Sequence, residues 1–197
     1  MQCGAWQPRV APSALEDLLS YDDCLGEPDR DLDGLTDACE HALARAFAPV
    51  LLQNNGDCDF DAAGGRIRGG YMHAAQGVEA GRVRIAYLPA YLTDCGWAGL
   101  KCLLPGVDCS PHAADSEFIV VDAVHDERAG WRVEGVFLSA HCFDGDAPAC
   151  RWWRGAELSE LEWTGSHPIV RVADGRHANY PDRAACERGH HFLDSCD

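Results

Sequence analysis

Histidines and carboxylates that could bind a metal or move protons occur at three places in the second half of the chain. His112, Asp115 and Glu117 precede one apolar run, His141 closes another, and His177 follows a third. Neutral imidazole and carboxylate groups are the usual protein ligands of zinc, calcium, magnesium and manganese, and they also act as general acids and bases. Because each cluster lies at the end of a strand-like segment, we expect these five side chains to converge on one divalent cation at the rim of a sheet.

A cation held there would support hydrolysis. It would lower the pKa of a bound water toward neutrality and polarise an ester or phosphoester oxygen. Glu117 would then be the general base or a further ligand, His177 a catalytic residue bound to the metal, and Arg176 a cation that stabilises developing negative charge. The sequence contains no glycine-rich phosphate loop, no Gly-x-Ser-x-Gly motif and no His-Glu-x-x-His motif, so the chemistries of those motifs are not indicated.

Aromatic residues supply candidates for a substrate groove. They are Trp97, Trp152, Trp153 and Tyr180. Core packing or loop anchoring is an equally good interpretation of the tryptophans. In the same way, each histidine taken alone fits a surface position or an ordinary hydrogen bond, so the metal site depends on several of them meeting.

The acidic segment 29–40 predicts a separate calcium site. Its oxygen ligands would be Asp29, Asp31, Asp33, Asp37 and Glu40, which alternate with other residues around a glycine at position 34. Calcium takes about six to eight oxygen ligands, and a tight loop of alternating aspartates provides them. The glycine and the glutamate stand at the sixth and twelfth positions, as in an EF-hand, whereas the Gly-Leu-x-Asp part resembles the calcium repeats of thrombospondin type 3. We expect this ion to be structural. The alternative is an acidic cap for the helix that begins near residue 36.

The charge balance constrains the partners. The 197-residue chain has 32 acidic and 16 basic residues and a net charge of −16. Such a surface repels nucleic acid and anionic membranes unless a bound cation bridges them, so we expect no nucleic-acid partner. No segment reaches the roughly 18 apolar residues of a membrane span. An apolar content of 47% supports a folded core, and we expect a monomer.

Eleven cysteines without a Cys-x-x-Cys pair indicate disulfides in an oxidising compartment. Short separations favour three pairs, and the odd count leaves Cys3 as the candidate free thiol. A cytosolic protein with many buried thiols is the alternative. We expect a secreted protein whose signal peptide has been removed. The favoured pairs are Cys24–Cys39, Cys142–Cys150 and Cys186–Cys196.

The hydrophobic pattern predicts a mainly β fold, an antiparallel β-sandwich with one N-terminal helix and long disulfide-tied loops. We divide it into an arm, residues 1–46, with the calcium loop and helix, and a sandwich domain, residues 47–197, with the second metal site. The expected helix covers 36–48, after a short helical candidate at 13–19. The expected strands are two hairpins, 66–74 with 82–91 and 117–125 with 131–141, and a further strand at 169–173; loops are expected at 92–114 and 142–155.

Residues 47–181 resemble the secreted vacuolar-protein-sorting-like proteins of plants and fungi and, more distantly, the necrosis- and ethylene-inducing-like proteins. The matching segments are Ala48-Pro-Val-Leu51, His112-Ala-Ala-Asp-Ser-Glu117, Leu138-Ser-Ala-His141, His167-Pro-Ile-Val170 and Gly175-Arg-His-Ala-Asn-Tyr-Pro181. The resemblance implies a β-sandwich in which histidines and acids bind a divalent cation. The residues it implies are His112, Asp115, Glu117, His141 and His177.

The chain departs from these families at several positions. Ser116 replaces a tryptophan, Arg176 replaces a small residue, and the compact Gly-His-Arg-His-Asp-Trp-Glu motif is absent, so the resemblance does not carry over a toxin activity. We therefore predict a secreted metal-dependent hydrolase of esters or phosphoesters that uses zinc, manganese, magnesium or calcium. The alternative is a cation-dependent protein that binds a small molecule, a glycan or a lipid headgroup without turnover, as a lectin or cytolysin does. A purely structural role for both metal sites is the third hypothesis.

Overall fold

A computed structural model describes residues 4–5, 20–53, 69–77, 79–95, 112–140, 142, 150–192 and 194–196. Within this set the side chains of residues 4, 5, 69, 112 and 190–192 are not part of the description. The short helical segment at 13–19, Cys3, Trp97 and His141 lie outside these ranges. The division of the chain into an arm, residues 1–46, and a sandwich domain, residues 47–197, stays a prediction.

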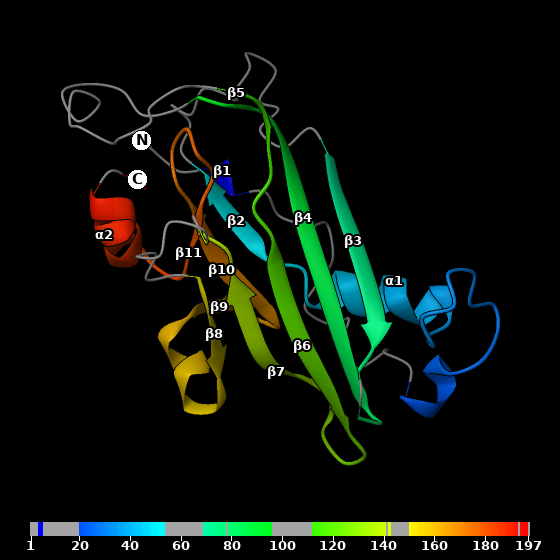
Figure 1. The fold of residues 1–197 in the computed structure, drawn as a ribbon. Helices are drawn as coiled ribbons and strands as arrows, with labels where there is room; N and C mark the ends of the chain where they lie inside the picture. Colours follow the sequence, from blue (N-terminus) through cyan, green and yellow to red (C-terminus); the bar gives the residue numbers. More distant parts are fainter. Residues whose placement is uncertain are drawn as a thin grey trace.

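The chain forms two β-sheets, as predicted (Figure 1). The large sheet has the order β3-β4-β6-β7-β8, and β5 also pairs with β4, in an entirely antiparallel arrangement. Its strands are β3 (Gly69–Gln76), β4 (Arg82–Asp94), β5 (His112–Asp115), β6 (Ile119–Asp126), β7 (Gly130–Leu138) and β8 (Arg151–Arg154).

The small sheet has the order β1-β2-β10-β11, with β9 paired to β10. Strands β2 and β10 are parallel, and the other pairs are antiparallel. Its strands are β1 (Gly4–Ala5), β2 (Val50–Gln53), β9 (Glu162–Thr164), β10 (His167–Val172) and β11 (Asn179–Tyr180).

Alternation along the central strand explains how the large sheet buries one face. On β4, Val83, Ile85 and Tyr87 are buried, whereas Arg84 is exposed. Since neighbouring residues of a strand point to opposite faces, the odd-numbered positions pack inward. They join buried residues of the small sheet, such as Val170 and Val172, in one hydrophobic core.

Helix α1 (Asp37–Ala46) packs on the same inner face, and the structure confirms the predicted N-terminal helix. The Thr36 hydroxyl accepts a hydrogen bond from the Cys39 N–H at 3.3 Å and caps the helix. Leu43 is fully buried, and the Tyr87 hydroxyl donates to the Ala44 carbonyl at 2.8 Å. These contacts fix the helix against β4.

Both predicted hairpins are present, with ends shifted by a few residues. Two expected loops contain strands: β4 continues to Asp94 and β5 follows in the segment 92–114, while β8 lies in 142–155. Helix α2 (Arg183–Phe192) was not predicted from the sequence. Short 3-10 helices occur at η2 (Asp22–Cys24) and η4 (Gly155–Glu160). No helix of the described part has the length and apolar character needed to cross a membrane.

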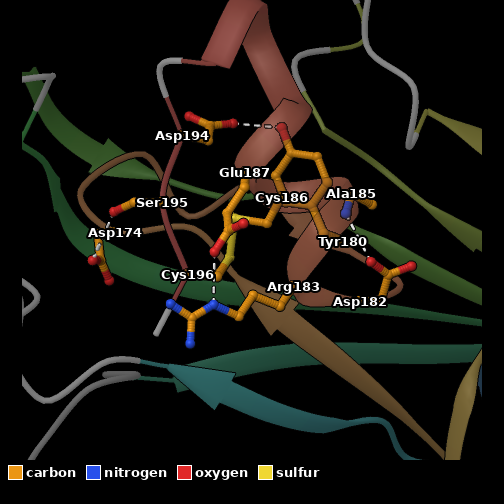
Figure 2. The surroundings of a disulfide bond; sticks show 10 residues. All are labelled: Asp174, Tyr180, Asp182, Arg183, Ala185, Cys186, Glu187, Asp194, Ser195 and Cys196. Carbon is orange, nitrogen blue, oxygen red and sulfur yellow. Dashed lines mark hydrogen bonds and ion pairs between the residues drawn. A yellow bond between two sulfur atoms is a disulfide. The ribbon is translucent and has the colours of Figure 1, made fainter.

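All three favoured cysteine pairs form disulfides. The Cys24–Cys39 bond joins η2 to α1, and Cys142–Cys150 closes the segment before β8. Cys186–Cys196 ties α2 to the C-terminal segment, where the buried hydroxyl of Tyr180 donates a hydrogen bond to Asp194 (Figure 2).

Candidate functional site

The acidic loop before α1 is shaped by the first of its aspartates. The Asp29 carboxylate accepts backbone N–H groups of Leu32 at 2.8 Å, Asp33 at 3.3 Å and Gly34 at 3.1 Å. Gly34 has a φ of 98°, and a Cβ at this position would collide with the Gln76 side chain. Only glycine combines that backbone conformation with so close an approach to β3.

Two elements hold this loop in place. The Cys24–Cys39 disulfide brackets it, and the Thr36 N–H donates to the Cys24 carbonyl at 2.8 Å. On the other side, the Gln76 N–H of β3 donates to the Asp33 carbonyl at 3.3 Å. The loop is therefore fixed both to its own helix and to the edge strand of the large sheet.

This arrangement brings four potential ligands of a metal ion together. Ligand atoms of Asp31, Asp33, Glu40 and His73 all lie within 4.8 Å of one another. His73 Nδ1 lies 3.5 Å from Asp31 Oδ2, and His73 Nε2 lies 3.7 Å from Asp33 Oδ2. Three carboxylates and one imidazole, from a loop, a helix and a strand, form a donor set that could hold a divalent cation.

Asp33 has one oxygen that the protein does not satisfy. Its side chain is 10% exposed, Oδ1 accepts the Leu35 N–H at 3.0 Å, and Oδ2 is buried without a hydrogen-bond partner. The 3.7 Å separation from His73 is too long for a hydrogen bond. Burying a carboxylate oxygen without a partner costs free energy, and a bound cation would offset this cost.

Glu40 experiences the same concentration of negative charge. Glu40 lies in the first turn of α1 and is 8% exposed. Burial first, and then the charges of Asp33 and Asp31, raise the pKa of the Glu40 carboxyl to about 7. A divalent cation would compensate this repulsion and favour the ionised form of all three acids.

The five acids predicted to bind calcium have different contacts in the structure. Asp31, Asp33 and Glu40 enter the cluster, whereas Asp29 shapes the loop. Asp37 faces Arg30, with Oδ2 3.3 Å from Nε. His73 was not predicted to be a ligand, because no local pattern in β3 relates it to a loop more than thirty positions earlier in the chain.

Two of the residues predicted for the second site are in contact. His177 Nδ1 lies 2.9 Å from Asp115 Oδ2. The His177 ring is fully buried and stacks on Tyr91, with 3.8 Å between ring centroids and 2° between planes. The end of β5 and the turn after β10 thus meet over β4 and form an aspartate–histidine pair.

The remaining candidates of this site contact other groups. Glu117 accepts a hydrogen bond from the Ser139 hydroxyl. Arg176 Nε lies 3.7 Å from the buried Asp94 carboxylate. The side chain of His112 and all of His141 lie outside the described residues, so the five-ligand site stays a prediction.

The aromatic candidates occupy different environments. Trp153 and Tyr180 are core residues, 1% and 0% exposed. Burial, together with the neighbouring Asp194, raises the pKa of the Tyr180 hydroxyl well above its ordinary value. Trp152 instead lies half-buried on the outer face of β8, and Trp97 is outside the described ranges.

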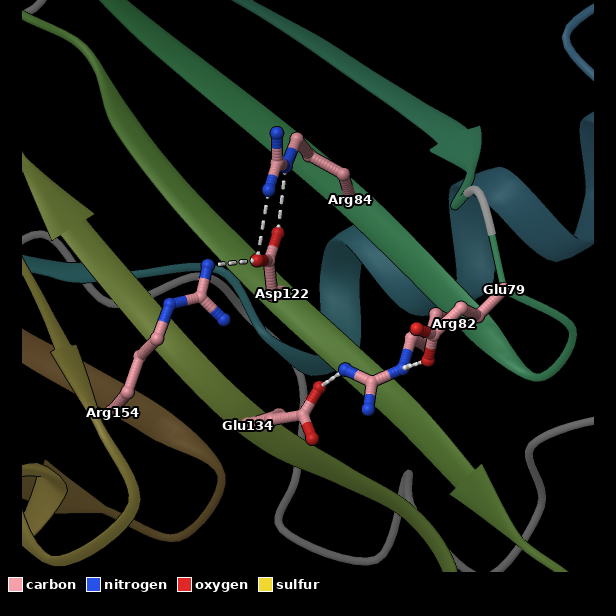
Figure 3. A network of polar contacts seen from close by, with 6 residues as sticks. All are labelled: Glu79, Arg82, Arg84, Asp122, Glu134 and Arg154. Atoms are coloured by element: carbon pink, nitrogen blue, oxygen red, sulfur yellow. Dashed lines mark hydrogen bonds and ion pairs between the residues drawn. The ribbon is translucent and has the colours of Figure 1, made fainter.

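That outer face of the large sheet carries a cavity of about 470 Å³. Its lining includes Ala75 and Ala86 of the outer face, together with ionic pairs between arginines and acids (Figure 3). His73 also lines it, so the four-ligand cluster lies at its edge. The paired residues are Arg82 with Glu79 and Glu134, and Arg84 and Arg154 with Asp122.

Comparison of the chain with protein-family models, with curated proteins and with solved structures gives no match, so the two-family resemblance seen in the sequence stays a prediction.

Proposed function

We propose that this protein is an exported, calcium-dependent binding protein whose cation is held by Asp31, Asp33, Glu40 and His73. The observation that carries the proposal is the convergence of these four side chains within 4.8 Å, with a buried, unsatisfied oxygen on Asp33. Calcium is the ion of choice because three of the four ligands are carboxylates and the loop has calcium-loop spacing. The disulfides support export.

The cluster adjoins a cavity in which a ligand of the cation could lie. His73 is shared between the cluster and the cavity on the outer face. A cation with open coordination positions at this edge would reach a ligand in the cavity, while the protein side chains fill only part of its coordination shell. Such a cation would also join the N-terminal loop to β3.

Calorimetry on chelator-treated protein tests this proposal. We expect calcium to bind with one equivalent per chain. Asp33→Asn should weaken binding at least about tenfold, because it removes one charged ligand. Glu127→Gln changes the same charge at an exposed turn and should bind calcium normally. Equal calcium affinity in all three proteins would overturn the assignment of the site.

The predicted metal-dependent hydrolase is the second candidate, and one contact favours it. The pairing of Asp115 with His177 is the arrangement in which a carboxylate orients an imidazole for proton transfer or metal binding. If the protein hydrolyses esters or phosphoesters with added zinc or manganese, Asp115→Asn should lose most of this activity. Turnover that persists in that variant would exclude the pair from catalysis.

A further inference from the structure

Two arginines on the outer face of the large sheet share one aspartate. Arg84 of β4 donates to both oxygens of Asp122, from Nε at 2.8 Å and from Nη2 at 3.0 Å. Arg154 of β8 donates from Nη2 to the same carboxylate at 2.6 Å. Figure 3 shows the guanidinium groups of Arg84 and Arg154 approaching the Asp122 carboxylate from two different directions. One acid on β6 therefore fixes two cations from different strands.

Trp152 contacts both arginines and restricts their guanidinium groups further. The Arg154 and Arg84 guanidinium carbons lie 4.0 and 5.1 Å from the centre of the Trp152 ring. Phe137 packs on the same indole at 5.5 Å. Cation–π contacts and hydrogen bonds thus restrict both guanidinium groups before any ligand arrives, which lowers the entropy lost on binding.

Gly135 leaves room for the side chain of Arg154. Gly135 of β7 lies opposite Arg154, and a Cβ there would stand 3.1 Å from Arg154 Nη1. A side chain at this position would therefore require the Arg154 guanidinium to shift by a few tenths of an ångström. Glycine at position 135 thus lets Arg154 lie close to the backbone of β7.

Donor groups remain for a ligand. The bonds to Asp122 use two N–H groups of Arg84 and one of Arg154, and each guanidinium has several more. Their side chains are 58% and 43% exposed, whereas Asp122 is 14% exposed beneath them. Two cations and one anion give this triad a net charge of +1 within a chain of −16.

We propose that Arg84 and Arg154 form a binding site for one oxyanion group, a carboxylate or a phosphate, of a small ligand held in the cavity beside them. Guanidinium forks recognise the planar or trigonal oxygens of such groups through paired hydrogen bonds. Asp122 is the positioning residue. Arg82, Glu79 and Glu134 on the same cavity wall add a net charge of −1, so the lining favours one anionic group over several. This site goes beyond the calcium site and does not require it.

Titration of the full-length, isotope-labelled protein with acetate and with inorganic phosphate tests the site by NMR at constant ionic strength. We expect the Nε–H signals of Arg84 and Arg154 to shift and saturate with at least one of the two anions. Saturation by acetate alone identifies a carboxylate site, and saturation by phosphate identifies a phosphate site. Shifts that grow linearly with either anion, or equal shifts with chloride, would overturn the proposal.

Matched variants separate the site from general charge effects. Arg84→Gln with Arg154→Gln should weaken anion binding at least tenfold. Arg151→Gln removes a charge of similar exposure, 47%, from the same strand but outside the cavity, and it should bind normally. Equal weakening in this control would contradict the assignment.

A third variant leaves the arginines untouched. Ala86→Phe places a ring in the cavity and should abolish saturable binding, whereas Ala90→Phe adds the same ring farther along the outer face of β4 and should not. Normal binding in Ala86→Phe would overturn the cavity as the site. Saturable binding of glucose in place of the anions, or tighter binding to anionic vesicles than to the small anions, would also overturn it.

Discussion

His73 and Asp33 face each other across the junction between the N-terminal loop and the large sheet, with Nε2 3.7 Å from Oδ2. His73 lies on the edge strand β3, and Asp33 belongs to the loop that precedes α1. A cation between them would be bound by both parts of the molecule. A bound cation would therefore add to the hydrogen bond from Gln76 N–H to the Asp33 carbonyl, which already joins the loop to β3.

The imidazole of His73 should affect whether the cluster prefers zinc or calcium. Imidazole suits zinc and other transition metals, whereas calcium prefers oxygen. His73→Ala should therefore weaken zinc binding at least about tenfold and calcium binding much less. Competition titrations with both ions measure this difference, and His41→Ala, at an exposed position of α1, is the control. An equal loss for zinc and calcium would show that His73 acts through the fold rather than as a ligand.

The acidic loop 29–40 and His73 differ in how far the sequence predicts their place in the cluster. The acids of 29–40 are predictable because their spacing is local and the chain itself forms the loop. His73 is not, because its position depends on how β3 docks. Burial then separates acids that look equivalent in the sequence: Asp33 turns toward the cluster, while Asp29 accepts backbone N–H groups.

The secondary structure likewise contains elements that the sequence predicts and one helix that it does not. Strands with regular alternation, such as β4, were predicted. Helix α2 was not, because its buried positions Ala185, Cys186 and Gly189 have helical spacing but small side chains, and the segment around them is polar on average. Its packing depends on Tyr180 and on the Cys186–Cys196 bond, which are tertiary features.

The disulfide beside the loop should support the cation site. Cys24 and Cys39 are separated by 15 residues, and their cross-link restricts the unfolded chain. Replacing both by alanine should lower the free energy of unfolding by about 3 kcal/mol and also weaken calcium binding. Urea unfolding and calorimetry measure the two effects. Removing the Cys186–Cys196 pair should lower stability without changing calcium affinity; an unchanged affinity in the first variant would contradict the link.

The lowered pKa of Asp122 should make the free energy of unfolding depend on pH. Burial alone would raise its pKa, but hydrogen bonds from Arg84 and Arg154 outweigh burial and lower the pKa below its ordinary value. The folded state therefore binds this proton less readily than the unfolded state, so the stabilisation is complete above about pH 4 and is lost as the pH falls toward the lowered pKa. In urea unfolding between pH 7 and pH 3, Arg84→Gln should lose less stability than the parent protein, and Arg151→Gln should lose as much as the parent. A parallel pH profile for Arg84→Gln would refute the pairing.

A crystal structure of the protein grown with calcium tests the central claim most directly, through the anomalous signal of the bound ion. The account predicts one strong peak within about 2.3–2.6 Å of carboxylate oxygens of Asp31, Asp33 and Glu40. A protein saturated with calcium that shows no peak at these residues would contradict it.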